Sequence, residues 1–117
     1  MQKTSRVFVA GHKGLVGSAI CEVLNRTGFH NILTASRTEV DLRNQSAVHQ
    51  FMKEQKPDYV FVAAGKVGGI HANSTYAADF IYENLIIAAN VIHAAYEARV
   101  KKLLYLGSSC IYPKFCP

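Results

Sequence analysis

The segment Arg6-Val-Phe-Val-Ala10-Gly11-His-Lys-Gly14-Leu-Val-Gly17 decides the expected fold of this chain. A short apolar strand leads directly into a turn with three glycines, and apolar residues at helical spacing follow from Leu15. Such a turn directs backbone N–H groups and the positive end of a helix dipole toward a bound pyrophosphate. The glycines permit the tight turn, the approach of a ligand to the backbone and the close packing of helix on strand. The segment therefore predicts a dinucleotide-binding site.

Strands and helices are expected to alternate along the rest of the chain. The predicted strands are residues 7–10, 31–35, 59–63 and 103–107, and the third has the continuous apolar character of a strand buried on both faces. The predicted helices run from Leu15 to an end at Gly28, from a cap near Asn44 to Pro57, and from about residue 79 to 98. This order predicts an α/β fold, a Rossmann-type doubly wound parallel sheet with right-handed crossovers that is truncated after the fourth strand.

Composition and charge narrow the class of protein. The 117 residues are 50% hydrophobic and 18% charged, which is typical of one globular domain. The net charge of +5 comes from scattered lysines and arginines, and this favours a phosphorylated small molecule as partner over nucleic acid. The polar start shows no signal peptide and no apolar run has the length of a membrane span, so we expect a cytoplasmic protein with no membrane contact.

The cysteines and histidines give no sign of a metal or disulfide site. Cys21, Cys110 and Cys116 match no zinc or disulfide spacing. Four of the five histidines show no ligand spacing either, and we expect no metal; these four are His12, His30, His49 and His93.

Two cations near the glycine turn point to the kind of dinucleotide. Arg37 lies just after the second predicted strand, where an acidic residue would accept a ribose hydroxyl of NAD. A guanidinium at that point is suited to the 2′-phosphate of NADP(H), and Lys13 adds a second charge. The alternative is that both are solvated surface cations, and Glu39 and Asp41 leave NAD open. Asp41 and Leu42 are expected at the adenine end.

Polar side chains follow the other strands at the same edge of the sheet. Ser108 and Ser109 follow the fourth strand, and Ser108 is a candidate to bind a substrate carbonyl or alcohol. Cys110 is a candidate for proton transfer, although a Ser-rich turn and a buried thiol explain the same residues. Lys66 lies in the loop after the third strand, and Asn84 lies on the long helix among apolar neighbours. Both are candidates for a contact with the ligand.

Four segments taken together resemble the GDP-L-fucose synthase family of extended short-chain dehydrogenases/reductases. They are Gly11-His-Lys-Gly-Leu-Val-Gly-Ser-Ala19, Ala64-Gly-Lys-Val-Gly-Gly-Ile70, Asp79-Phe-Ile-Tyr-Glu-Asn84 and Gly107-Ser-Ser-Cys-Ile-Tyr-Pro-Lys114. The likeness runs from about residue 6 to residue 114. The family epimerises GDP-4-keto-6-deoxy-D-mannose at C3 and C5 and reduces the C4 ketone with NADPH.

The resemblance implies a set of site residues and partners. Ser108 would bind the C4 oxygen, Cys110 would act as one acid/base of the epimerisation, and Ser109 would contact the GDP-sugar substrate. The full-length family is expected to form homodimers through the helix that begins near residue 79. The residues expected to bind NADP(H) are Gly11, His12, Lys13, Gly14, Leu15, Val16, Gly17, Arg37, Asp41, Leu42, Ala63, Ala64 and Lys66.

The chain departs from the family pattern in one important respect. No tyrosine is followed by lysine four positions later, so the Tyr-x-x-x-Lys pair of the family has no match in these 117 residues. We therefore expect residues 1–117 to be the N-terminal part of an NADP-binding Rossmann domain, with the substrate domain absent and no activity as this fragment. The alternative is a non-catalytic NADP-binding remnant or sensor module.

Overall fold

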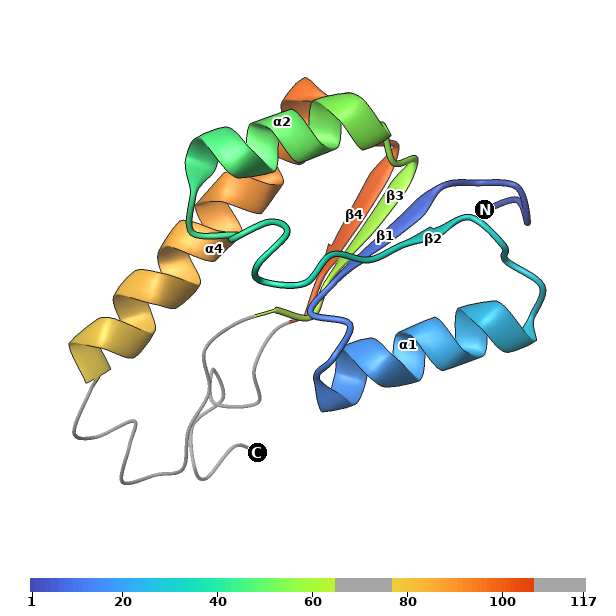
Figure 1. Cartoon of the computed structure of the whole chain (residues 1–117), viewed down its shortest axis with the longest axis horizontal. Helices are drawn as coiled ribbons and strands as arrows, with labels where there is room; N and C mark the ends of the chain where they lie inside the picture. The colour runs from blue at the N-terminus through green and yellow to red at the C-terminus, as the bar shows by residue number, and fades with distance from the viewer. Residues whose placement is uncertain (65–76, 107–117) are drawn as a thin grey trace, which may run out of the picture.

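A parallel four-stranded sheet with strand order β2-β1-β3-β4 forms the centre of the fold (Figure 1). The computed structural model describes residues 1–64 and 77–106. Its strands are β1 Val7–Ala10, β2 Ile32–Leu33, β3 Tyr59–Val62 and β4 Lys102–Tyr105. Its helices are α1 Leu15–Arg26, α2 Gln45–Gln55 and α4 Ala77–Glu97. The predicted α/β fold of Rossmann type is confirmed.

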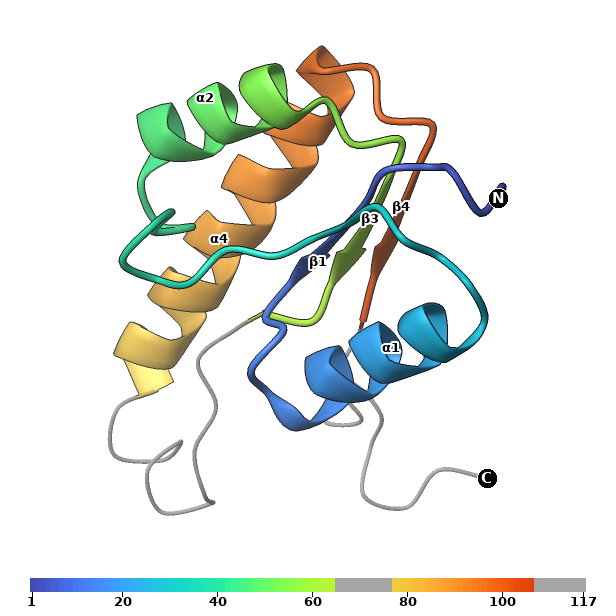
Figure 2. The same cartoon turned by 45° about the vertical axis from the view of Figure 1, so that its right-hand side comes forward.

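The three helices cover the two faces of the sheet unequally. Helix α1 lies on one face, and α2 and α4 lie side by side on the other (Figures 1 and 2). Because successive strand residues point to opposite faces, β1 contributes to both cores. Val7 and Val9 pack with Leu24 and Phe29 on the α1 side. The core on the other side consists of Phe8, Ala10, Val48, Met52, Val60, Val62, Ile87, Val91 and Ala94.

Local signals in the sequence account for the ends of the first two helices. The Asn44 side-chain oxygen accepts a 3.1 Å hydrogen bond from the Ala47 N–H, which confirms the predicted cap of α2. Helix α2 ends before Pro57, with Lys56 in the left-handed region at φ 47°. Gly28 follows α1 with φ 97°, a conformation that glycine adopts without a Cβ clash. The expected helix stops at Gly28 and Pro57 are therefore confirmed.

Two strands differ from the sequence expectation. Strand β2 has only two paired residues, because Leu33 pairs with Phe8 and the chain then leaves the sheet. Strand β3 is fully buried only at Val60 and Val62, on the side covered by two helices. On the α1 side Phe61 is half-buried, because a single helix covers that face less completely. The predicted burial of β3 on both faces is therefore correct for one face and only partial for the α1 face.

Strand β4 lies at the edge of the described sheet and pairs with β3 from Tyr59–Lys102 to Val62–Tyr105. Leu104 is 52% exposed, so this strand is less covered than β1. Within the described ranges, no helix combines the length and apolar character needed to cross a membrane.

Candidate functional site

A cavity of about 500 Å³ opens at the carboxyl edge of the sheet. This volume is in the range of small-molecule sites, and ligands of open α/β sheets bind at this edge. Four segments contribute to its walls: the glycine turn, the loop after β2, Ala64 after β3, and helix α4. The lining residues are Gly11, His12, Lys13, Gly14, Ala35, Ser36, Arg37, Val40, Asp41, Leu42, Arg43, Ala64, Glu83 and Ile87.

The glycine turn is held against the sheet by contacts that leave no space for a side chain. A Cβ on Gly17 would lie 1.9 Å from the carbonyl oxygen of Gly11, so the first turn of α1 packs directly on the turn. Gly11 has φ 86°, and a Cβ there would lie 2.7 Å from backbone atoms of Ala63 and Ala64. Gly14 has ordinary space, with Gly11 O at 3.5 Å from its ideal Cβ. Gly11 and Gly17 therefore shape the turn, while Gly14 faces the cavity.

Arg43 and Asp41 form a forked ion pair on the opposite wall. The guanidinium donates hydrogen bonds of 3.0 and 2.8 Å to the two carboxylate oxygens, and the Arg43 backbone N–H adds a third at 3.0 Å. These hydrogen bonds lower the pKa of Asp41 to about 2. Arg43 also reaches Glu83 of α4 at 3.4 Å. All three residues line a second cavity of about 540 Å³, so they form the partition between the two cavities.

Arg37 and Lys13 are the exposed cations of the cavity. Neither forms a salt bridge with any residue in the described part of the chain. Hydrogen bonds from Ser36 lower the pKa of Glu39, and the nearby His12 and Lys13 lower it further. The cavity thus presents positive charge where the glycine turn faces the loop after β2.

Helix α4 fixes the loop that carries Leu42. The Asn90 side chain is 7% exposed and donates a 2.9 Å hydrogen bond to the Leu42 carbonyl oxygen. Glu83 and Ile87 of the same helix line the cavity directly. Residues 83, 87 and 90 follow the spacing of one helix face, so a single face of α4 supports the cavity.

The structure brings together most of the cofactor residues that the sequence predicted. The residues that line the cavity as expected are Gly11, His12, Lys13, Gly14, Arg37, Asp41, Leu42 and Ala64. Gly17 and Ala63 lie behind the turn and shape it, while Leu15 and Val16 are 89% and 51% exposed outside the lining. Lys66, Ser108, Ser109 and Cys110 lie outside the described residues.

Sequence reasoning did not identify Arg43 or Asn90. Arg43 lies only two positions after Asp41, and this spacing is the one local signal for their ion pair. Asn90 lies on the apolar face of α4, where a buried amide needs a hydrogen-bond partner. Asn84, to which the same argument applies, is only half-buried.

Comparison with known proteins identifies relatives across the whole chain. The model of the NAD dependent epimerase/dehydratase family matches residues 7–117. GDP-L-fucose synthase 1 of Arabidopsis thaliana is 60% identical over 115 residues, covering 98% of this chain and 36% of that protein. GDP-L-fucose synthase of Escherichia coli K12 is 54% identical over 109 residues, covering 93% of this chain and 34% of that protein.

A solved structure supports the same relationship. MlghC, a GDP-mannoheptose C4 reductase from Campylobacter jejuni with NADP bound, matches with a TM-score of 0.94 and 48% identity. The match covers 100% of this chain and 37% of the reductase. The chain therefore spans about a third of the length of the relatives it matches.

We expect Gly17→Ala to destabilise the chain by about 2–3 kcal/mol, because the new methyl group would overlap the Gly11 carbonyl. Urea unfolding followed by circular dichroism measures this change. Gly14→Ala is the matched control and should cost no more than about 1 kcal/mol, mainly through its place at the N-cap of α1. Equal losses in the two variants would contradict the packing described for the turn.

The Asp41–Arg43 pair should make stability depend on pH in the acid range. The pKa of Asp41 is about 2 when folded and near 3.8 when unfolded, so its contribution is complete above pH 4 and is lost as the pH falls toward 2. Asp41→Asn should lower the free energy of unfolding at pH 6 by at most about 1 kcal/mol, because the pair is partly exposed.

The measurement is urea unfolding of wild type and Asp41→Asn at pH 6 and at pH 3. The difference between them should narrow at pH 3. Glu22→Gln, an exposed substitution on α1, serves as control. A difference for Asp41→Asn that stays constant from pH 6 to pH 3 would show that the carboxylate charge does not stabilise the fold.

Proposed function

The chain belongs to the NAD dependent epimerase/dehydratase family, and we propose that it forms the N-terminal, cofactor-binding part of a GDP-L-fucose synthase. The whole protein would convert GDP-4-keto-6-deoxy-D-mannose to GDP-L-fucose by epimerisation at C3 and C5 and reduction at C4. Identities of 60% and 54% to two proteins named GDP-L-fucose synthase support this substrate class.

The charge pattern of the cavity supports NADP(H) as the cofactor. Arg37 and Lys13 are exposed cations without a salt bridge among the described residues. Both oxygens of Asp41 accept hydrogen bonds from Arg43, and Glu39 accepts one from the Ser36 N–H at 3.1 Å. Both oxygens of Asp41 are therefore engaged by Arg43, and one oxygen of Glu39 is engaged by Ser36, which leaves these carboxylates less suited to bind the ribose of NAD. A guanidinium is well suited to bind a 2′-phosphate instead.

The backbone around the glycine turn suits the diphosphate. Gly14 is the N-cap of α1 and has no side chain over the first N–H groups of the helix, which would bind the pyrophosphate. Asp41 and Leu42 would border the adenine at the other end of the cavity. When bound, NADPH supplies the hydride for the reduction at C4.

The catalytic roles in this proposal rest on the sequence resemblance. Ser108 would bind the C4 oxygen, Ser109 would contact the substrate, and Cys110 would carry a proton to or from the carbon that is epimerised. The described chain leaves β4 at the same edge as the cavity, since the Leu106 N–H donates to the Val62 carbonyl at 3.1 Å. Lys66 would complete the cofactor contacts. The homodimer and the cytoplasmic location stay predictions.

Arg37→Ala should weaken NADPH binding by about tenfold or more, because one charge-assisted contact to a phosphate is worth at least about 1.4 kcal/mol. NADH binding should change by less than about twofold, since NADH has no 2′-phosphate. Fluorescence titration of the chain with each reduced cofactor measures both affinities. Arg26→Ala, at an exposed position on α1, is the control. Equal losses for NADPH and NADH would contradict the assignment of Arg37 to the 2′-phosphate.

Turnover tests whether the 117 residues are catalytic by themselves. We expect the 117-residue chain to bind NADPH without oxidising it in the presence of GDP-4-keto-6-deoxy-D-mannose, because it has no Tyr-x-x-x-Lys pair to protonate the carbonyl. Absorbance at the reduced nicotinamide band measures oxidation. Formation of GDP-L-fucose by this chain alone would show that another group supplies the proton.

A further inference from the structure

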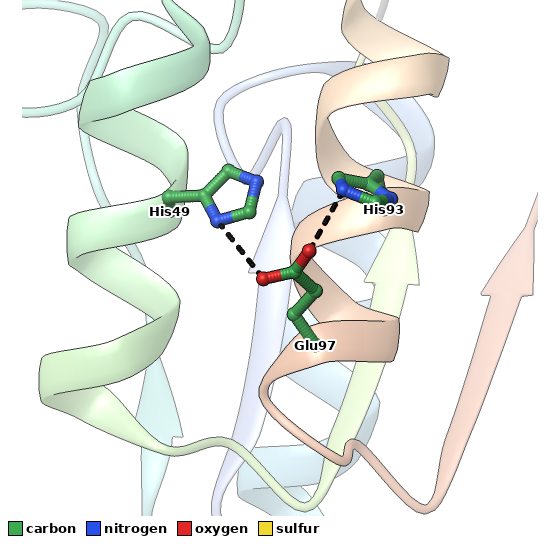
Figure 3. A group of neighbouring side chains, drawn as sticks. All are labelled: His49, His93 and Glu97. Atoms are coloured by element: carbon green, nitrogen blue, oxygen red, sulfur yellow. Dashed lines mark ion pairs between the residues drawn. The ribbon is translucent and has the colours of Figure 1, made fainter.

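Two histidines and a glutamate meet on the outer surface between α2 and α4. His49 comes from α2, and His93 and Glu97 come from successive turns of α4 (Figure 3). His49 and His93 are 44 positions apart in the chain, so their spacing in the sequence gave no indication of a shared site. None of the three residues lines the cavity of the glycine turn.

The Glu97 carboxylate lies between the two imidazoles and presents one oxygen to each. Its Oε1 is 2.9 Å from His93 Nε2, and its Oε2 is 3.9 Å from His49 Nδ1. One candidate ligand atom from each residue lies within 4.8 Å of the other two. The two imidazole rings are tilted by 59° with centroids 5.4 Å apart. One nitrogen of each ring, His49 Nδ1 and His93 Nε2, faces the Glu97 carboxylate (Figure 3).

The donor set is that of a borderline transition metal. Two imidazole nitrogens and a carboxylate oxygen are typical ligands of Zn²⁺, with metal–ligand distances near 2.0–2.2 Å. Two such ligands on a tetrahedral ion lie about 3.3 Å apart. The side chains of His49, His93 and Glu97 are 31%, 54% and 54% exposed, so rotation of their outer bonds can close the remaining gap. Mg²⁺ and Ca²⁺ prefer sets made of oxygen atoms.

The helices that carry these ligands are held together by the core beneath them. Val48 and Met52 of α2 pack with Val91 and Ala94 of α4, all four at most 1% exposed. His49 and His93 are therefore presented by backbone positions that are fixed before any ion binds. A cavity of about 780 Å³ lined by His49 and Glu97 gives water and small ions access to the cluster.

We infer that His49, His93 and Glu97 form a binding site for a divalent transition metal of the Zn²⁺ type that links α2 to α4. The three residues supply three ligands, and the open side leaves a position for water. The site is separate from the proposed cofactor site, so its presence does not depend on the function proposed above.

The test is calorimetric titration of the untagged, EDTA-stripped chain with ZnCl₂, and with MgCl₂ as comparison. We expect one Zn²⁺ per chain at this site, a higher midpoint of thermal unfolding with Zn²⁺, and no effect of Mg²⁺. His49→Gln and His93→Gln should each weaken Zn²⁺ binding by at least about tenfold, because each removes a direct ligand. Far-UV circular dichroism before titration confirms that each variant is folded.

His30→Gln is the matched control, because His30 is an exposed histidine outside the cluster. It should bind Zn²⁺ as the wild type does. Wild-type affinity in both His49→Gln and His93→Gln would overturn the inference and assign the ion to other groups, such as the cysteines. Failure of the wild type to bind Zn²⁺ would also overturn it and leave the cluster as an ion pair. Glu97→Gln provides a third variant if either histidine substitution prevents folding.

Discussion

The contact between the first turn of α1 and the end of β1 is the constraint on which the cavity depends. Gly17 lies so close to the Gly11 carbonyl that a side chain at Gly17 is excluded, and the backbone of Ala63 and Ala64 excludes a side chain at Gly11. The backbone of the turn therefore rests on the sheet edge, and the N-terminus of α1 opens toward the cavity. A bulkier residue would lift the helix away from the sheet and move the N–H groups that suit an anion. The loop after β2 and the helix α4 then complete a cavity whose floor is backbone.

The two arginines that line the cavity differ in whether they form ion pairs with the protein. Arg43 is engaged by Asp41 and Glu83, and this ion pair ties the loop after β2 to helix α4. Arg37 stands outside that network, although its field contributes to the low pKa of Asp41. The two arginines of this loop thus differ: Arg43 is held in ion pairs, whereas Arg37 is exposed and is the residue proposed to bind the 2′-phosphate.

Local pattern predicted most of the fold, and contacts between distant segments explain what it missed. The bounds of β1 and the cap at Asn44 follow from residues within a few positions of each other, and the sequence identified them. The short β2 depends on where β1 stops pairing, which no local signal contains. The Asn90–Leu42 hydrogen bond joins residues 48 positions apart, and it became visible only when α4 was placed over the loop. The motif predicted the glycine turn and Arg37, which line the cavity, whereas the role of Arg43 became visible only in the folded structure.

Because α4 supports the loop that carries Leu42, the position of this helix determines the width of the cavity. One helix, α4, carries Glu83, Ile87 and Asn90. Its next residues toward the C-terminus, Val91 and Ala94, pack in the core. A small shift of α4 along its axis would move Glu83, Ile87 and Asn90 together. The width of the proposed nucleotide site therefore depends on how α4 packs on the sheet, more than on the loop after β2.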